Sequence, residues 1–482
     1  MSALTLIARD ELWLMRRSRV SVIAAALLIV LVVIAGITSV AHQSNVADTR
    51  ARLQAQVDEE FDNQPSRHPH RMVHFGHFIF RPLPPLAAFD PGIDAFTGNA
   101  MFLEGHRQNS ANFGDVRQSS ILVRFGQLTP AFVLQTLAPL LIIFLGYGAV
   151  ARERGAGTLR QLFMQGVSAG TLIAGKLLAL ATVAALIAIP AMSVLIFVAA
   201  QPGAAAGPIA LTAAGYLTYL ALWSIIVVLV SASVARPRNA LLALLGLWSV
   251  TVILLPRIAP DLAATAVPQP TRLETDLTLQ RELRAMGDSH NPDDPVFAAF
   301  KQRVLRQYGV RRVEDLPVNY KGLLAVEGER MTSELFDRYA SEGFARQARQ
   351  SATMDAIGTL SPAVAMRRLS MAAAGTDLAG HARFLDQAEA YRYDLVQRLN
   401  RLQADAVSFE DDAAKSSDTA AEQRSRIDPH HWHAMPDFHF APPEPGDLVR
   451  RASPAAVMLL LWLLVPALLL APAARRLEGV RS

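Results

Sequence analysis

Hydrophobic and polar positions separate into long blocks along this 482-residue chain. A helix needs about 20 apolar residues to cross the hydrocarbon core of a bilayer. Six runs approach or reach that length, and Pro190 in the third does not exclude it, because membrane helices tolerate proline. The pattern therefore predicts six membrane-spanning helices, over about residues 20–40, 132–150, 177–200, 209–234, 240–258 and 454–470.

The two longest polar connections show helical periodicity. Behind a predicted cap at Asp294, apolar residues share one face as far as Gly309. Residues 376–404 repeat leucine and alanine with the period of a long amphipathic helix. Residues 407–447 lose this period and are expected to form a loop, and the prolines in 67–93 leave room only for a short strand. The predicted fold is an all-α membrane protein with a mainly helical domain built from the two long loops.

Basic residues near the apolar runs predict the orientation of the chain. They precede the first run and lie in alternate short connections, and positive flanks stay in the cytoplasm. Both termini are therefore expected to be cytoplasmic, and the two long loops extracytoplasmic. The expected division is 1–40 (N-terminus and first helix), 41–130 (first extracytoplasmic loop), 131–258 (helices two to five), 259–452 (extracytoplasmic helical domain) and 453–482 (sixth helix and cytoplasmic C-terminus).

Composition narrows the class of protein. Hydrophobic residues make up 51% of the chain, and the mean hydropathy is +0.25, which fits a membrane protein with large water-facing parts. A net charge of +4 does not indicate nucleic acid as a partner. The chain has no cysteine, which excludes disulfides, thiolate metal sites and cysteine nucleophiles. The apolar runs contain no Asp, Glu or His, which argues against an intramembrane enzyme. We predict no catalytic or cofactor-binding residue.

A charged, glycine-rich segment joins the second and third apolar runs. Residues 151–176, here named the coupling segment, read ARERGAGTLRQLFMQGVSAGTLIAGK. Its glycines allow a sharp turn, Thr158 can cap a short helix, and apolar residues of that helix, Val167 among them, can dock on a partner. An ordinary interhelical loop is the alternative. The residues predicted to couple the chain to a partner are Glu153, Gly157, Thr158, Leu159, Leu162 and Phe163.

Within the coupling segment, Gly170 and Gly175-Lys176 have the spacing of a phosphate-binding P-loop. Position 177 is leucine, where a P-loop needs a hydroxyl for Mg²⁺. No strand is expected before it, and an apolar run follows directly. We therefore interpret this stretch as a loop with a lysine at the membrane interface.

Histidines gather in two places in the long loops. Imidazole is a good ligand for copper, zinc or nickel, but no fixed carboxylate partner is evident, and solvated polar loops are the alternative interpretation. No metal ligand is assigned from the sequence. The clusters are His68, His70, His74 and His77, then His430, His431, His433 and His439.

The coupling segment resembles the permease subunits of type-2 ABC exporters. In that family a Glu-x-Gly-Thr-Leu motif lies between the second and third of six spans. Here Glu153 is followed by Gly157-Thr158-Leu159, with two inserted residues for which Gly155 and Ala156 are candidates. The first long loop resembles a subgroup with an uncharacterised extracytoplasmic domain, through the stretches FRPLPPLAAFDPG (80–92) and LEGHRQN (103–109). A large domain before the sixth span also belongs to that pattern.

The resemblance implies a transport subunit of the bacterial cytoplasmic membrane, with ATP hydrolysis by a separate ATPase subunit. It also implies a second permease chain, as a homodimer or a paired permease, and leaves open a periplasmic protein partner. Two alternatives remain at this point. One is a membrane-anchored scaffold or sensor whose outer domain binds a protein. The other concerns cargo, namely metal or metal-site maturation.

Overall fold

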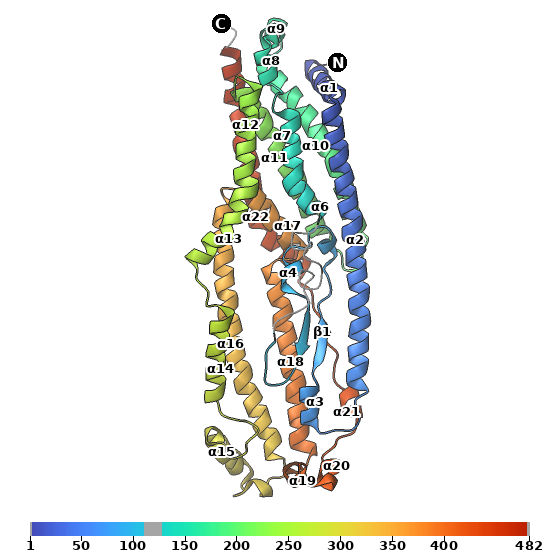
Figure 1. Cartoon of the computed structure of the whole chain (residues 1–482), viewed down its shortest axis with the longest axis vertical. Helices are drawn as coiled ribbons and strands as arrows, with labels where there is room; N and C mark the ends of the chain where they lie inside the picture. Colours follow the sequence, from blue (N-terminus) through green and yellow to red (C-terminus); the bar gives the residue numbers. More distant parts are fainter. Residues whose placement is uncertain (1, 110–127, 480–482) are drawn as a thin grey trace.

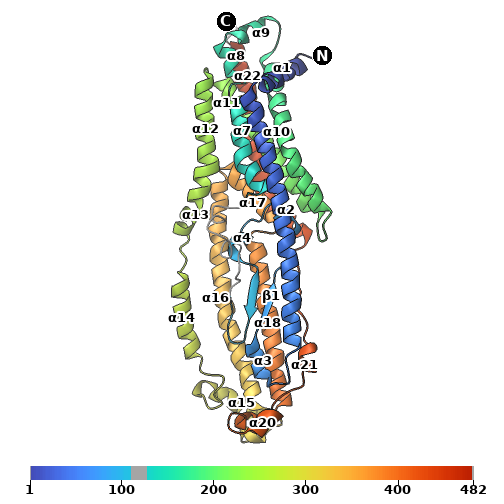
Figure 2. The ribbon, with the colours of Figure 1, turned by 45° about the vertical axis from the view of Figure 1, so that its right-hand side comes forward.

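The computed structural model describes residues 2–109 and 128–479 as an elongated, mostly helical body (Figure 1). Both ends of the chain lie at one extremity, together with α1 (Ala3–Arg17), α8 (Ala151–Gly155) and α9 (Thr158–Met164). The opposite extremity contains α15 (Ala298–Tyr308) and α20 (Thr419–Arg424), and Figure 2 shows the same arrangement from another side. We call these the terminal end and the distal end.

Six candidate membrane spans are found in the described part of the chain, which confirms the predicted number. Two contain a π-helical turn, η3 (Val133–Leu137) and η4 (Ser249–Leu254), between ordinary helical segments. The spans are α2 (Arg19–Asp62), α6–η3–α7–α8 (Pro130–Gly155), α10 (Ala169–Ala199), α11 (Ala206–Ser233), α12–η4–α13 (Pro237–Ala266) and α22 (Pro445–Glu478).

Helix α2 extends far beyond its apolar run. Its 44 residues correspond to about 66 Å at 1.5 Å per residue, roughly twice the hydrocarbon thickness. The predicted boundary at residue 40 therefore falls inside a continuous helix. In the polar half, Arg50 Nη1 donates to the carbonyl of Arg81 over 2.8 Å, and the Phe80 amide donates to Gln54 Oε1 over 3.0 Å. These bonds fix the first loop against α2.

Helix α1 was not predicted, because its residues were interpreted only as positive flank. Ser2 caps it, Ser18 separates it from α2, and it packs along α10. A Cβ added at Gly175 would lie 2.7 Å from Ile7 Cγ2, so the glycine is what permits this close approach. The chain therefore begins, within the described residues, with a helix packed on the third span.

The distal half is built around a helical hairpin. Helix α16 (Tyr320–Gly358) packs on α18 (Leu378–Ala406), and α17 (Pro362–Ala374) connects them. The predicted long amphipathic helix is α18, and the predicted start at Asp294 is η5 (Pro295–Phe297), which runs into α15. Helix α14 (Arg272–Ala285), opened by a capping box, and η6 (Val313–Asp315) complete this part.

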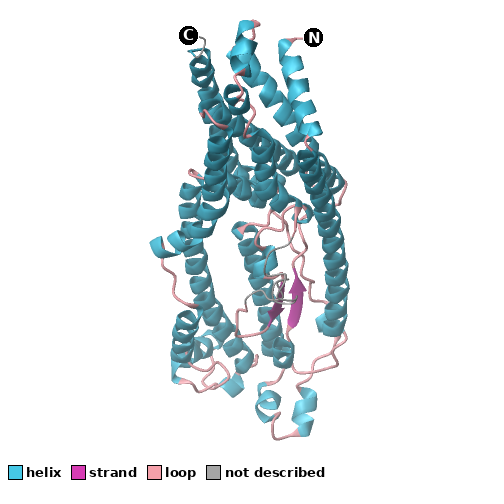
Figure 3. Ribbon diagram, turned by 45° about the horizontal axis from the view of Figure 1, so that its top comes forward, coloured by secondary structure: helices cyan, strands magenta, loops and turns pink. Residues whose placement is uncertain are grey.

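One prediction for the loops needs correction. Residues 407–447 are not one loop, since they form α19 (Phe409–Ala414), α20 and α21 (His430–His433), helices too short to show a period. The predicted mainly helical fold is confirmed, and the described residues add one pair of strands to it. Strands β1 (His77–Phe80) and β2 (Ala100–Leu103) form an antiparallel pair in which His77 lies opposite Leu103 (Figure 3). The expected short strand is β1, and its partner was not expected.

Around this strand pair the first loop forms α3 (Pro69–Phe75), η1 (Pro85–Ala88) and α4 (Asp94–Thr97). Arg81 is buried and donates to Asp94 Oδ1 and to the Gly375 carbonyl, each over 2.9 Å. The Thr376 hydroxyl donates to the Asp90 carbonyl over 3.1 Å. The stretch 80–92 thus fastens the first loop to the turn between α17 and α18.

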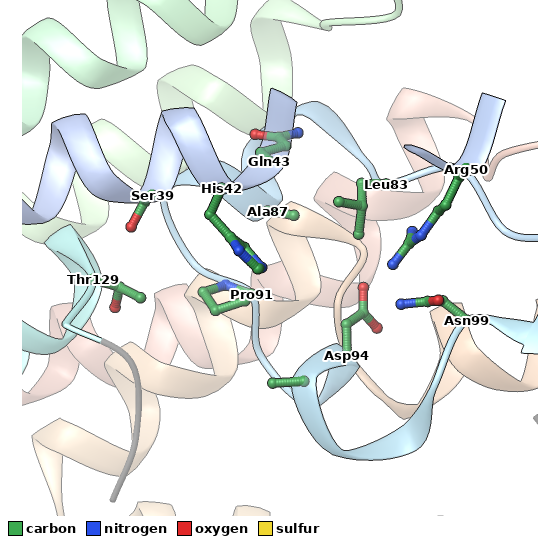
Figure 4. A pocket seen from close by; sticks show the side chains of 11 residues that line it. Ser39, His42, Gln43, Arg50, Leu83, Ala87, Pro91, Asp94, Asn99 and Thr129 are labelled. Atoms are coloured by element: carbon green, nitrogen blue, oxygen red, sulfur yellow. The ribbon is translucent and has the colours of Figure 1, made fainter. Parts of the chain in front are cut away.

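A small pocket lies where α2 leaves its apolar half. His42 and Arg50 enter it from α2, and Asp94 and Asn99 from the first loop (Figure 4). Burial raises the pKa of the Asp94 carboxyl, and the Arg81 charge opposes that rise. The pocket belongs to the joint between α2 and the first loop.

Buried charges hold the distal hairpin together. Arg392 of α18 is 1% exposed and binds Glu329 Oε1 of α16 over 2.6 Å through Nη1. It also binds Glu389 on its own helix and donates to Ser333 Oγ over 2.8 Å. Burial alone would raise the pKa of Glu329, but the hydrogen bond from His106 and the Arg392 charge lower it to about 2. Glu329 is therefore ionised and fully paired.

We predict that Arg392→Ala lowers the stability of the distal half by about 3–5 kcal/mol, because it leaves two carboxylates buried without their cation. Thermal unfolding of the detergent-purified protein measures this. The control is Arg398→Ala, which removes an exposed pair with Asp394 on the same helix and should cost less than about 1 kcal/mol. Equal melting temperatures for both variants would contradict the assigned role of Arg392.

Candidate functional site

The coupling segment lies at the terminal end of the molecule, beyond a break in the second span. Helix α7 (Ala138–Gly146) ends before Tyr147, and α8 starts at Ala151. Ser231 of α11 bridges the break. Its hydroxyl donates to the Tyr147 carbonyl over 2.8 Å and accepts the amides of Val150 and Ala151 at 3.0 and 3.2 Å. The exit of α8 from the bundle is therefore fixed by a side chain of the fourth span.

Four charged residues from α1, α8 and α10 lie in contact where these three helices meet. Lys176 Nζ, on α10, binds Glu11 Oε2 of α1 over 2.6 Å and Glu153 Oε1 of α8 over 2.9 Å. Arg152 Nη2 donates to Glu11 Oε1 over 3.0 Å. Lys176 is 2% exposed and Glu11 1% exposed, so each charge needs its partners. This set of Glu11, Arg152, Glu153 and Lys176 is named the Lys176 cluster.

Helix α9 continues from this cluster. Gly157 has a left-handed conformation, with φ of 76°, and supplies the sharp turn between α8 and α9. Thr158 does not cap α9, since Gly157 occupies that position. Its hydroxyl instead donates to the Glu153 carboxylate and carbonyl. The motif residues therefore close one turn, with the acid and the hydroxyl bonded to each other.

The faces of α9 differ from the prediction. Leu159 and Phe163 are 2% and 6% exposed and belong to the chain's own apolar core, and Leu162 is partly buried against it. Met164 is 81% exposed and adjoins exposed Arg160, Gln161 and Gln165. The sequence pattern identified an apolar face correctly but could not tell whether the partner was this chain or another. The face open to a partner is the one around Met164.

The stretch with P-loop spacing was interpreted from the sequence as a loop, but the structure shows it as helix. Gly170 and Gly175-Lys176 are not in a loop, because α10 begins at Ala169. Gly175 admits α1, and Lys176 is buried in ion pairs. The lysine is thus held by Glu11 and Glu153 inside the chain and does not lie in an exposed loop.

Basic residues concentrate at the terminal end. They come from α1, α8, α9, the connection between α11 and α12, and the last turns of α22, which all lie at this extremity in Figure 1. These residues are Arg9, Arg16, Arg17, Arg152, Arg154, Arg160, Arg236, Arg238, Arg475 and Arg476.

In the first histidine cluster, two residues pair with carboxylates and the other two lie side by side. His68 pairs with buried Asp412 over 3.1 Å, and His77 pairs with Asp58 over 2.9 Å, so both tie the first loop to neighbouring helices. His70 and His74 lie one turn apart on α3 with their Nε2 atoms 3.2 Å apart. Burial, then the neighbouring His74, lowers the pKa of His70 to about 2.

The second histidine cluster does not form a common site in the structure. His430 pairs with Asp428, the His433 ring lies 2.7 Å from the Asp62 carbonyl, and the His439 ring lies 3.0 Å from the Asp437 carbonyl. The order of this segment comes instead from Trp432, which is buried and donates to the Gln64 carbonyl over 3.1 Å.

Two histidines missed by sequence reasoning lie beside His70 and His74. They are His106, from the turn after β2, and His290, from the loop after α14. Within residues 2–109 and 128–479, these four form the one group of histidine and acidic side chains close enough together to hold a metal ion. His106 lies in the stretch 103–109, but His290 stands alone in the sequence, and no local spacing indicates it.

Residues 272–441 match a family described as a domain of unknown function (DUF3526). The match begins at α14 and covers the hairpin and α19–α21, and it includes His290 and Arg392. No curated protein matches the sequence. The chain is therefore a multi-pass membrane protein that contains this domain between its fifth and sixth candidate spans.

We predict that Lys176→Met destabilises the terminal end by about 3–5 kcal/mol, since two carboxylates lose their buried cation. The double variant Glu11→Gln/Lys176→Met should recover part of that loss, because residues in one ion-pair network are not additive. Melting temperatures of the purified proteins measure both effects, with the exposed Arg160→Ala as the control. A double variant that loses the sum of its single losses would contradict direct pairing.

Proposed function

We propose that this protein is the permease subunit of an ATP-driven ABC exporter, and that α8 and α9 receive the motion of a separate ATPase subunit. ATP hydrolysis is then supplied by the other chain. A second permease chain, identical or paired, completes the transport unit, and the bilayer surrounds the six spans. The location is the cytoplasmic membrane of a bacterium, with the terminal end inside.

The observation that supports this proposal is the Lys176 cluster behind the Glu153 motif. An element that transmits force from a partner must be rigidly attached to the helices that it moves. Glu153 joins α8 to α10 through Lys176, and Glu11 joins α1 to the same lysine. A displacement of α9 therefore moves the first helix and the third span together. An ordinary loop between two spans would need no buried three-helix ion pair.

The surface of α9 supports the proposal independently. Its inner face is anchored by Leu159 and Phe163, while the outer face presents Met164 between polar side chains. An exposed apolar residue on an anchored helix is the arrangement with which a helix docks in the groove of a partner. By the positive-inside rule, the basic residues at the terminal end favour a cytoplasmic location for that surface.

The first test concerns the docking surface. Met164→Asp should abolish or strongly reduce capture of an ATPase chain with the affinity-tagged protein from host membranes, because an unpaired carboxylate in a contact costs several kcal/mol. ATPase activity and mass spectrometry of the eluate are measured. The control is Leu277→Asp on α14, an equally apolar exposed site in the distal half. ATP hydrolysis by the isolated chain, or unchanged capture by Met164→Asp, would exclude this proposal.

The second test concerns topology. The chain has no cysteine, so single substitutions can be labelled selectively. Ser416→Cys in the distal half should react with a membrane-impermeant thiol reagent on spheroplasts, and Ser168→Cys in the coupling segment should react only after lysis. Both serines are exposed, so burial does not confuse the comparison. Labelling of position 168 before lysis would reverse the proposed orientation.

A further inference from the structure

Four histidines from three separate segments converge on one point of the distal half. His70 and His74 come from α3, His106 from the turn after β2, and His290 from the loop between α14 and η5. One ring nitrogen of each lies within 4.8 Å of those of the other three. The ring centroids are 4.7–6.3 Å apart in all pairs. This group is named the four-histidine cluster.

The backbone is shaped to bring these segments together. A Cβ at Gly105 would lie 2.2 Å from Val73 Cγ1, and the Gly105 amide donates to the Val73 carbonyl over 3.2 Å. The turn therefore presses directly on α3. His106 follows with φ of 61°, the one positive value found for a non-glycine residue in the described ranges. Such a conformation costs about 1–3 kcal/mol unless its surroundings enforce it.

Helix α16 contacts both the turn that carries His106 and the loop that carries His290. A Cβ at Gly328 would lie 2.3 Å from Ser289 Cβ, so the glycine lets the loop with His290 lie against the helix. The next residue, Glu329, accepts the His106 amide over 3.0 Å and lies 3.1 Å from its Nδ1. Adjacent residues of α16 thus position histidines from both long loops.

Hydrogen bonds select which nitrogens remain available. Nδ1 of His106 is bonded to Glu329, and Nδ1 of His290 lies 3.0 Å from Asp288 Oδ1. Their Nε2 atoms are left for a ligand, and that of His106 is buried without a protein partner. A carboxylate on the far nitrogen of a histidine fixes its tautomer and orientation, as in metal centres. Sequence reasoning did not include His106 in a cluster, and its partner Glu329 lies 223 residues away in the sequence.

The donor set indicates the class of ion. Four neutral imidazoles suit zinc, copper or nickel, whereas calcium and magnesium require oxygen ligands. Burial lowers the pKa of His70 and His74, which favours the neutral ring that a metal ligand requires. A tetrahedral ion with bonds of about 2.0–2.1 Å places its nitrogen ligands roughly 3.3 Å apart. The Nε2 atoms of His70 and His74, 3.2 Å apart, already meet this spacing, and side-chain rotations can close the remaining gaps.

We propose that His70, His74, His106 and His290 bind one divalent late first-row transition-metal ion, for which Zn²⁺ and Cu²⁺ are the probes. The ion joins the first loop to the region matched by the domain of unknown function. His74 and His290 are exposed, so it can enter from solvent. The site does not depend on whether the chain is a permease.

The test uses the full-length protein, purified in detergent with a histidine-free affinity tag and stripped with a chelator. Calorimetric titration with ZnCl₂ and with CuCl₂ should give one ion per chain for at least one of them, and that ion should raise the melting temperature. His290→Ala and His106→Ala should each weaken binding by at least tenfold and abolish the thermal shift. The matched control, His430→Ala/His431→Ala, removes the exposed His430 and the half-buried His431, which lie outside the cluster, and should bind as the wild type does.

A further variant separates binding from folding. Asp288→Asn keeps all four imidazoles and changes only an exposed carboxylate. It should melt at the wild-type temperature without metal and bind roughly 10- to 100-fold more weakly. Binding that is unchanged in His290→Ala, or lost in the His430→Ala/His431→Ala control, would overturn the proposal. So would the absence of saturable binding of both ions by the wild type.

Discussion

The ion pair between Arg392 and Glu329 is the contact on which the distal half depends. It joins α18 to α16 inside a narrow helical hairpin, where two charges are tolerated only as partners. The other carboxylate oxygen of Glu329 faces His106, and thereby extends the same network to the first long loop. One buried acid thus sets the distance between the hairpin helices and the place of a turn that is more than 200 residues away in sequence.

The terminal end follows the same principle with different residues. Lys176 is buried between two acids from different helices, so α1, α8 and α10 can pack in only one relative register. Apolar surfaces alone would let these helices slide, since a hydrophobic contact has no preferred direction. Directional charge pairs therefore fix the helix packing both at the terminal end and within the distal hairpin. Between them, the membrane half contains one large apolar cluster, while the distal half has three smaller ones.

This division explains where sequence patterns succeeded. The six candidate spans follow from the length of the apolar runs, and the helix after Asp294 and the long helix α18 follow from periodicity. Both are local properties of the chain. The same patterns failed for α19–α21, which are too short for a period, and for the end of α2, where polarity changes but the helix continues. In the coupling segment they identified the Glu153 motif and an apolar face, but not which surface that face covers.

The sequence alone therefore determined the membrane class, the number of candidate spans and the position of the charged segment between the second and third of them. Length and polarity of local segments are sufficient for those properties. The tertiary structure alone decided that Lys176 pairs with Glu11 and Glu153, and that His106 and His290 join His70 and His74. These groups meet through packing between segments far apart in the chain, and no local spacing encodes which distant residue fills a neighbouring position.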